Sequence, residues 1–398
     1  DFDFDADWGN PESWAPFTYD FISTNDRERK TLSQEFRLTS TEDGRIFNDS
    51  TDWLVGLYLL DLDEDLTTRN QGIYVDPFSG FSLSLDDTLT SRFEALNVAL
   101  FGQLNFAVGD AGELGFGLRV ENRGTDYTDS NGLALDPDET MVGGELSYTH
   151  TFDEGLRAFV ALSRGYKAGG FNLGLVPPGG REFEQEALWS LETGIKALWL
   201  DGTMSFDGSV FYSRRVDQQV RTSVQLNPND PASFVFFTDN AAKGRSVGLE
   251  AEVHWTPTDA WQLYASVGLL DAEFDEFTSE AADLSGRDQA HAPNYTLALG
   301  GVWRHPTGFF ARLDLSARDA FFFDVSHDQR SEAYQLANAR VGFETERWSA
   351  ELWARNLFDE TYAVRGFFFG NEPPDFPNKL YIRQGDPRQV GATFEMRF

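Results

Sequence analysis

The sequence contains no cysteine among its 398 residues and only 3 methionines. Without cysteine there is no disulfide framework, no zinc-thiolate site and no thiol nucleophile. The sequence also lacks any run of about 18 apolar residues, and its mean hydropathy is -0.40, which together exclude helical membrane spans. A membrane barrel is not excluded, because half of each barrel strand faces water.

Basic residues are scarce, with 32 lysines and arginines against 65 aspartates and glutamates and a formal charge of -33. Such a balance argues against a nucleic-acid partner, because nucleic acids bind through cationic surfaces. Much of the acid falls in two predicted loops, where we expect a solvated rim. The alternative is that these carboxylates bind divalent cations that tie the loops to each other or to lipopolysaccharide. The two groups are Asp61, Asp63, Glu64 and Asp65, then Asp126, Asp129, Asp136, Asp138 and Glu139.

Aromatic residues, in contrast, make up 15% of the chain, and many stand in alternating segments. The last ten residues, QVGATFEMRF, alternate apolar and polar positions and end on Phe398. This pattern is typical of the lipid-facing last strand of an outer-membrane barrel. Similar segments recur throughout the chain and predict an all-β, antiparallel, up-and-down transmembrane barrel of about 16 strands. They span 1–8, 29–40, 52–66, 91–108, 112–127, 139–152, 156–170, 184–200, 203–222, 242–257, 260–276, 293–305, 308–323, 333–345, 348–364 and 388–398.

The connections between these segments alternate between short and long. Short turns rich in Gly, Pro and Asp are expected near 109–112, 152–155, 201, 257–260, 305–308 and 346, and long loops at 67–90, 128–138, 171–183, 223–241, 277–292, 324–332 and 365–387. Outer-membrane barrels have short periplasmic turns and long extracellular loops, so this alternation predicts sidedness.

The two faces of the predicted strands differ in the same way. Leu313, Leu315 and Phe343 belong to apolar series that we expect to face lipid, whereas Arg312 and Asp314 belong to the alternating charged series. Charged side chains cost several kcal/mol when they face lipid, so we expect them to line a wet lumen. Trp199, Trp255, Trp261, Trp303 and Trp348 stand near predicted turns, as an aromatic girdle requires.

Several segments resemble the barrel-forming, C-terminal part of TonB-dependent outer-membrane receptors. They are SQEFRLTS (33–40), SRGYKAGGFN (163–172), FEQEALWSLETGIKALWLDG (183–202), GRSVGLEAEVHWTPT (244–258) and ARNLFDETYAVRG (354–366). The resemblance implies uptake of a scarce nutrient such as a ferric siderophore across the outer membrane of a Gram-negative bacterium. Such receptors have a 22-stranded barrel filled by an N-terminal plug through which TonB is contacted. No plug-like region is found here, so we expect a single barrel domain over 1–398.

The sequence offers no catalytic constellation, and we expect no enzyme activity, cofactor or metal site. Its five histidines lack metal-ligand spacing, and no nucleophile elbow or P-loop is present. Two loop-proximal clusters are instead candidates for ligand capture, because exposed Phe beside polar donors suits an aromatic, partly apolar ligand. The alternative is that these residues form an upper aromatic girdle or pack loop against loop. The first cluster is Phe321, Phe322, Phe323, His327 and Arg330, and the second is Phe367, Phe368, Phe369 and Asn371.

Polar and cationic side chains near strand ends on the same side are weaker candidates for attracting an anionic chelate: Tyr166, Lys167, Arg214, Arg215 and Arg221. The leading hypothesis is therefore the barrel of a nutrient receptor, set in outer-membrane lipid and lipopolysaccharide. A plugless, porin-like passive channel and a structural barrel of a larger surface assembly remain as alternatives.

Overall fold

The computed structural model describes residues 2–8, 15–173, 180–225, 234–278, 283–325, 327–370 and 377–398. Asn371 of the second phenylalanine cluster lies outside these residues. Almost all regular structure among them is antiparallel β-sheet, and the only helix is a 3-10 turn at Glu42–Gly44. No helix in the described ranges is long and apolar enough to cross a membrane.

One sheet contains 17 strands, and two further pairs of strands lie beside it. Its strands are β1 (Phe2–Trp8), β2 (Thr18–Thr39), β3 (Thr51–Val75), β4 (Ser82–Val108), β5 (Gly112–Asp129), β6 (Ala134–Leu135), β7 (Asp138–Asp153), β8 (Leu156–Lys167), β11 (Glu186–Trp199), β12 (Met204–Gln225), β13 (Phe234–Thr258), β14 (Trp261–Phe277), β15 (Tyr295–Arg304), β16 (Phe309–Arg318), β17 (Tyr334–Glu344), β18 (Trp348–Arg355) and β21 (Gln389–Met396). The separate pairs are β9 (Gly170–Phe171) with β10 (Glu182–Phe183), and β19 (Ala363–Gly370) with β20 (Asn378–Gln384).

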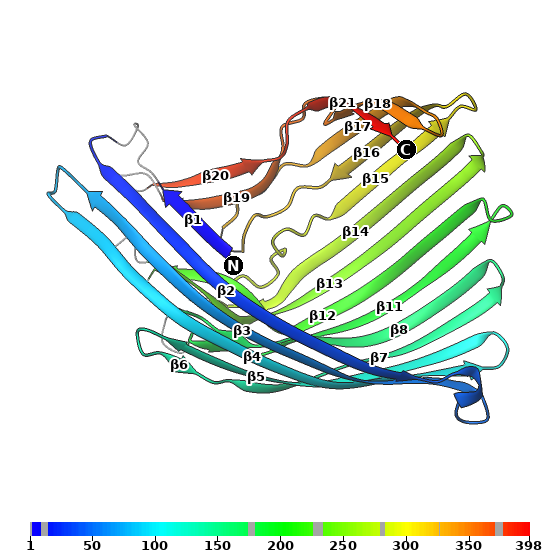
Figure 1. The fold of residues 1–398 in the computed structure, drawn as a ribbon, viewed down its shortest axis with the longest axis horizontal. Helices are drawn as coiled ribbons and strands as arrows, with labels where there is room; N and C mark the ends of the chain where they lie inside the picture. The colour runs from blue at the N-terminus through cyan, green and yellow to red at the C-terminus, as the bar shows by residue number, and fades with distance from the viewer. Residues whose placement is uncertain are drawn as a thin grey trace.

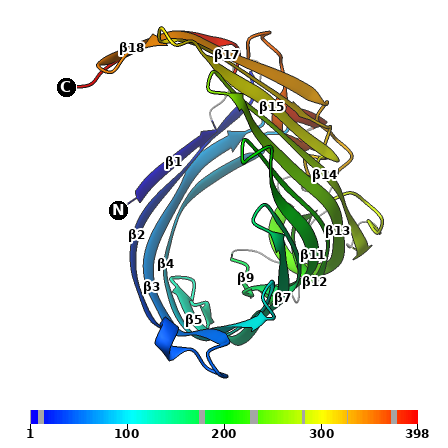
Figure 2. The same cartoon turned by 90° about the vertical axis from the view of Figure 1, so that its right-hand side faces the viewer.

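The large sheet follows chain order from β1 to β21. Each long strand pairs antiparallel with its neighbour along the chain, which gives the predicted up-and-down topology (Figure 1). The predicted number of strands is confirmed once the two-residue β6 is set aside. The strands curve around a central opening, with the first strands facing the last ones (Figure 2). No ladder joins β21 to β1 or β2 in the described part of the chain, so closure of the barrel stays a prediction.

The short connections lie together at one end of the sheet, as predicted (Figure 1). The turn after β15 illustrates the local chemistry. Gly308 has a φ of 103°, and a Cβ built there would lie 2.4 Å from the carbonyl oxygen of Glu344. Only glycine suits this position, because both the backbone conformation and the close strand exclude a side chain.

The first three long strands are longer than predicted. β2 begins at Thr18 rather than 29, and the predicted loop at 67–90 is mostly the end of the β3–β4 hairpin, whose tip is only 76–81. Consecutive polar residues interrupt the alternation over part of this hairpin, as at 67–71, where Asn70 stands opposite Asp87. Asp61, Asp63, Glu64 and Asp65 lie within β3, where Glu64 pairs with Arg29 at 2.5 Å, so the prediction that they belong to a loop is wrong.

Two strands are shorter than predicted, and one predicted loop contains a hairpin. The segment 308–323 ends as a strand at Arg318, and 348–364 ends at Arg355. Residues 365–387, predicted as a long loop, contribute to the β19–β20 hairpin. Consecutive phenylalanines at 321–323 and 367–369 carry no alternation, so the pattern gives no sign of which segment continues as a strand.

One face of the sheet is apolar and widely exposed. Leu100 and Leu313 are 60% and 47% exposed, as side chains that contact lipid rather than a protein core must be. Near the short turns this face is aromatic: the ring centroids of Phe309 and Phe343 are 4.8 Å apart, and those of Phe343 and Trp348 are 5.5 Å apart. The predicted girdle tryptophans lie in this region.

The other face carries the predicted charged series, which pair with one another. Arg119 pairs with Glu121 at 2.7 Å, and Arg312 with Asp314 at 2.8 Å. Buried apolar contacts are few in the described residues and gather under the long loops, in a small cluster of Val220, Ala242, Phe274, Phe277 and Val325.

Candidate ligand-binding loops

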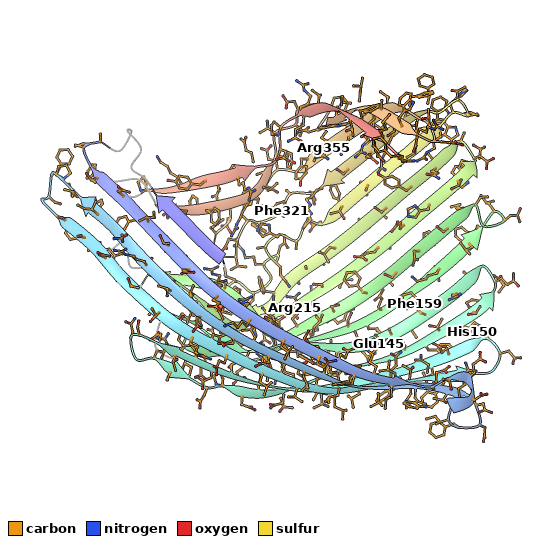
Figure 3. The ribbon with its side chains drawn as sticks, viewed as in Figure 1. Glu145, His150, Phe159, Arg215, Phe321 and Arg355 are labelled. Atoms are coloured by element: carbon orange, nitrogen blue, oxygen red, sulfur yellow. The ribbon has the colours of Figure 1, made fainter. Side chains whose placement is uncertain are left out.

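The first phenylalanine cluster lies in the loop between β16 and β17, at the long-loop end of the sheet, where Figure 3 labels Phe321. Phe321 and Phe323 are each 3% exposed, and their rings meet edge to face at 5.8 Å. His291, from the loop before β15, lies 5.2 Å from Phe321. Phe321 and Phe323 are therefore buried between loops. This agrees with the alternative interpretation, in which these residues pack loop against loop.

Backbone hydrogen bonds fold this loop back on itself. The Phe321 N–H donates to Ser331 Oγ at 3.0 Å, and the Ser331 N–H donates to the Phe321 carbonyl at 2.9 Å. The His291 N–H donates to the Phe322 carbonyl at 2.9 Å, which ties the loop to the one before β15. Because this bond and the ring contact between His291 and Phe321 join the two loops, the loops pack as one unit.

Phe322 is less buried than Phe321 and Phe323 and lies beside two guanidinium groups. The Cζ atoms of Arg287 and Arg330 are 4.6 Å and 4.5 Å from the ring centroid. Arg287 also pairs with Asp328 at 2.6 Å and donates to the His327 carbonyl. Arg330 is exposed, so its charge is available at the surface of the loop.

His327 links this loop to the second cluster. Its ring lies 5.6 Å from that of Phe368, edge to face, and its Nδ1 accepts a hydrogen bond from the Gln329 N–H at 3.2 Å. Burial lowers the pKa of His327 below its ordinary value, and burial together with Arg365 lowers the pKa of His291. Both rings are therefore neutral at pH 7.

The second cluster lies on β19, whose hairpin with β20 packs against the first loop. Phe367 and Phe369 remain 44% and 46% exposed, in contrast to the buried pair. Arg365 lies 4.7 Å from the centroid of Phe367, and Tyr381 of β20 lies 5.3 Å from that of Phe369. This edge of the hairpin thus presents two aromatic rings beside a cation.

The structure keeps Tyr166 and Arg214 apart from these loops. No hydrogen bond, ion pair or ring contact recorded among the described residues joins either of them to the phenylalanine clusters. Tyr166 donates to Glu121 Oε2 at 2.8 Å, and Arg119 Nε donates to the Tyr166 hydroxyl at 3.0 Å. Tyr166 therefore belongs to a hydrogen-bonded group on the charged face of the sheet.

Arg287, His291 and Arg365 were missed as site residues. Arg287 and His291 come from the loop before β15, and no local motif marks them. The meeting of two loops in space places Arg287 beside Phe322 and His291 beside Phe321, whereas Arg365 stands two residues before Phe367 on the same strand. Binding by these side chains stays a prediction, and among the described residues no group of three or more metal-ligating side chains accompanies them.

The family model for the β-barrel of TonB-dependent receptor-like proteins matches residues 1–357. The chain belongs to the TonB-dependent receptor family. This assignment confirms the predicted fold, a transmembrane antiparallel barrel, and the resemblance noted in the sequence.

Among curated proteins, this receptor barrel is similar to the pesticin receptor of Yersinia pestis, with 23% identity over 353 residues. That match covers 85% of the chain and 48% of the relative, so the chain spans about half the length of the curated protein. The name of the relative describes a receptor and not an enzyme.

Among solved structures, the ferric yersiniabactin uptake receptor FyuA of Yersinia pestis has a TM-score of 0.73 at 20% identity, covering 100% of the chain and 60% of FyuA. The siderophore receptor PiuA of Acinetobacter baumannii has a TM-score of 0.70 at 14% identity, covering 95% and 57%. These likenesses establish the fold.

Proposed function

We propose that this chain forms the wall of an outer-membrane receptor that imports a scarce nutrient into a Gram-negative bacterium, with a ferric siderophore as cargo. The observation that carries the proposal is the pair of exposed rings, Phe367 and Phe369, beside Arg365 at the long-loop end. Relatives described as a ferric yersiniabactin uptake receptor and a siderophore receptor support the choice of cargo.

The chemistry of the loops suits such a cargo. A catecholate-type chelate presents aromatic rings and negative charge, and it is met here by the two exposed rings and by Arg330 and Arg365. His327 and His291 add no positive charge at pH 7, because burial lowers the pKa of each. The cations are therefore arginines, whose charge does not change over the physiological range.

In this proposal residues 1–398 act as one barrel domain, set in outer-membrane lipid and lipopolysaccharide. Contact with TonB takes place through a plug domain, as in the family, and not through the described strands. The charged face lines the lumen through which the cargo passes, and pairs such as Arg312 with Asp314 keep it hydrated.

Uptake assays with the intact protein test the proposal. Cells that depend on it are supplied with iron chelates, haem, cobalamin or oligosaccharides in turn, and import of an iron chelate is expected. The double variant Phe367→Ala, Phe369→Ala is expected to bind that chelate about tenfold more weakly, because buried aromatic contacts dominate such interfaces. Phe78→Ala is the control, since Phe78 is 76% exposed on the separate β3–β4 tip.

Planar bilayers distinguish the other two hypotheses. A steady conductance of the intact protein, independent of any cargo, contradicts the receptor and supports a passive channel. A silent bilayer together with no uptake of any of the four cargo classes supports a structural barrel.

A further inference from the structure

A row of cationic and aromatic side chains crosses strands β8, β11, β12, β13 and β14 on the apolar face. In register, Arg164 stands opposite Trp189, Trp189 opposite Arg214, and Arg214 opposite Arg245. Glu273 of β14 ends the row beside Arg245. We refer to Arg164, Trp189, Arg214 and Arg245 as the arginine row.

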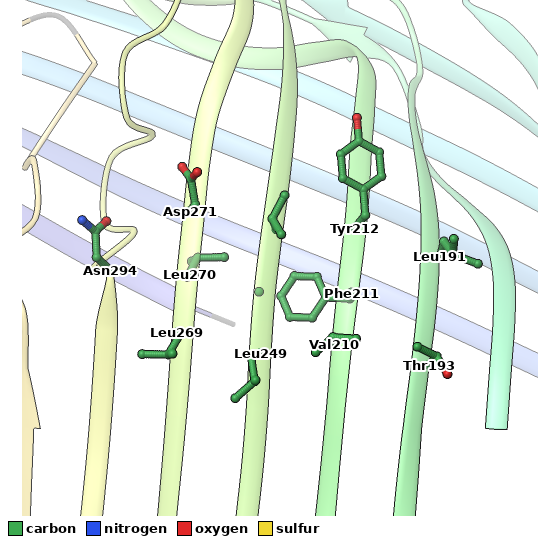
Figure 4. A pocket seen from close by; sticks show the side chains of 12 residues that line it. Leu191, Thr193, Val210, Phe211, Tyr212, Leu249, Leu269, Leu270, Asp271 and Asn294 are labelled. Carbon is green, nitrogen blue, oxygen red and sulfur yellow. The ribbon is translucent and has the colours of Figure 1, made fainter. Parts of the chain in front are cut away.

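The arginine row borders the apolar surface on the side of the long loops. One position closer to the short turns on the same face, the register places Leu162, Leu191, Tyr212 and Val247 side by side. Figure 4 shows Leu191 and Tyr212 with Leu249 and Leu269 further toward the turns. The same face thus changes from apolar to cationic within one step along each strand.

This change coincides with the expected edge of the hydrocarbon layer. Arg164 is the ninth residue of β8 (Leu156–Lys167) counted from the short turn, and Arg214 is the eleventh of β12 (Met204–Gln225). A tilted strand needs about 9–11 residues to cross the hydrocarbon core. The arginine row therefore lies at the level of the outer-leaflet head groups, where tryptophan side chains such as Trp189 are enriched.

The charges in the row are incompletely balanced. Arg245 pairs with Glu273 and lies 3.6 Å from Asp275, whereas Arg164 stacks 5.9 Å from the Trp189 ring and donates to the Val142 carbonyl. Arg214 is exposed, stands directly opposite Arg245 and forms no ion pair within the described ranges. The carboxylate of Glu276 interacts with Arg214 electrostatically, but its ion pair is with Lys243. Like charges in this position destabilise a sheet, so an external anion between them relieves the repulsion.

We propose that the arginine row binds the phosphate groups of lipopolysaccharide in the outer leaflet. Guanidinium groups bind phosphate through paired hydrogen bonds, and the Trp189 ring, 46% exposed, packs against the adjoining acyl chains. The chain as a whole carries a charge of -33, so this local row, rather than the net charge, provides the attraction. The inference rests on the outer-membrane location proposed above.

The test compares the intact receptor purified from outer membranes with the triple variant Arg164→Gln, Arg214→Gln, Arg245→Gln. Arg157→Gln is the matched control, because Arg157 lies on the same strand but on the opposite face, across from Lys196. Lipopolysaccharide that stays bound in detergent is counted by native mass spectrometry. The triple variant is expected to retain about tenfold less lipid than the control, since charge-assisted bonds to phosphate are lost.

Thermal stabilisation by added ligand identifies the chemistry. Diphosphorylated lipid A is expected to stabilise the wild-type receptor. Dephosphorylated lipid A is not expected to stabilise it, and neither is inorganic phosphate. Equal lipid retention by the triple variant, or equal stabilisation by inorganic phosphate, overturns the proposal.

If the triple variant does not assemble, Arg214→Gln alone is measured. A several-fold loss of bound lipid is expected, and no loss overturns the proposal. Uptake measured in the same cells separates the lipid site from the proposed transport. If the variant retains lipid unchanged and uptake is normal, only the lipid site is refuted. If wild-type cells show no uptake, only the proposed cargo transport is refuted.

Discussion

The ring of Phe323 fills the space that a side chain at Gly366 would need. A Cβ built at Gly366 would lie 2.4 Å from Cδ2 of Phe323, so the β19–β20 hairpin contacts the β16–β17 loop without any side chain in between. The exposed rings of Phe367 and Phe369 are thus positioned by a buried phenylalanine of the other cluster.

Gly366→Ala is expected to displace the hairpin while leaving the barrel folded, because Phe323 is confined on its other side by Phe321. Limited proteolysis is expected to cut the hairpin several times faster in the variant. Gly165→Ala is the control, since a Cβ there meets no atom within 4 Å. Equal cleavage of both variants contradicts the packing described here.

Leu313→Arg is expected to block assembly in the membrane. Leu313 is 47% exposed in the middle of β16, and an arginine facing lipid near the midplane costs about 2–4 kcal/mol. Ser316→Arg, on the other face of the same strand, is expected to assemble normally. The heat-modifiable folded fraction in isolated outer membranes measures both, and equal losses contradict the assignment of faces.

Glu121→Ala is expected to destabilise the barrel by about 1–3 kcal/mol, because it leaves three partly buried donors without their shared acceptor. Glu121 is 8% exposed and accepts bonds from Asn97 at 2.6 Å, Arg119 at 2.7 Å and Tyr166 at 2.8 Å. Unfolding by urea in detergent measures the loss. The control is Glu94→Ala, whose exposed pair with Arg92 contributes less than about 1 kcal/mol.

Acidification is expected to loosen the loops around His327 and His291. Burial lowers the pKa of both below 6.5, although Asp324 and Asp328 raise that of His327, so the unfolded loops bind more protons than the folded ones. Stability from this source is therefore complete above about pH 6.5 and is lost as the pH falls below it. Hydrogen exchange of residues 319–331 at pH 7.5 and 5.5 measures the effect, and it is expected to shrink in the variant His291→Gln, His327→Gln.

The number and order of the long strands could be predicted because alternation is imposed wherever one face meets lipid and the other water. The series through Leu313 and Leu315 shows this clearly, with charged Arg312 and Asp314 between them. Strand ends could not be predicted where consecutive polar residues interrupt this alternation. β3 continues to Val75 through such a run, which includes Asn70.

The loop cluster was only partly predictable for a different reason. Three consecutive phenylalanines mark a place where apolar surface gathers, but they do not tell which ring is buried. Phe321 and Phe323 are buried and Phe322 lies beside Arg287 and Arg330, because Arg287 and His291 come from another loop. That meeting depends on long-range arrangement, which no local pattern records.

The strands differ greatly in length around the sheet: β3 has 25 residues, whereas β18 has 8. Since both begin at the short-turn end, the wall rises far higher on the β2–β4 side (Figure 1). The long-loop end of the sheet is consequently slanted, and the β19–β20 hairpin lies on the side of the shorter strands. In the proposed uptake route, a molecule that arrives from outside passes the taller β2–β4 side before it reaches the rings of Phe367 and Phe369.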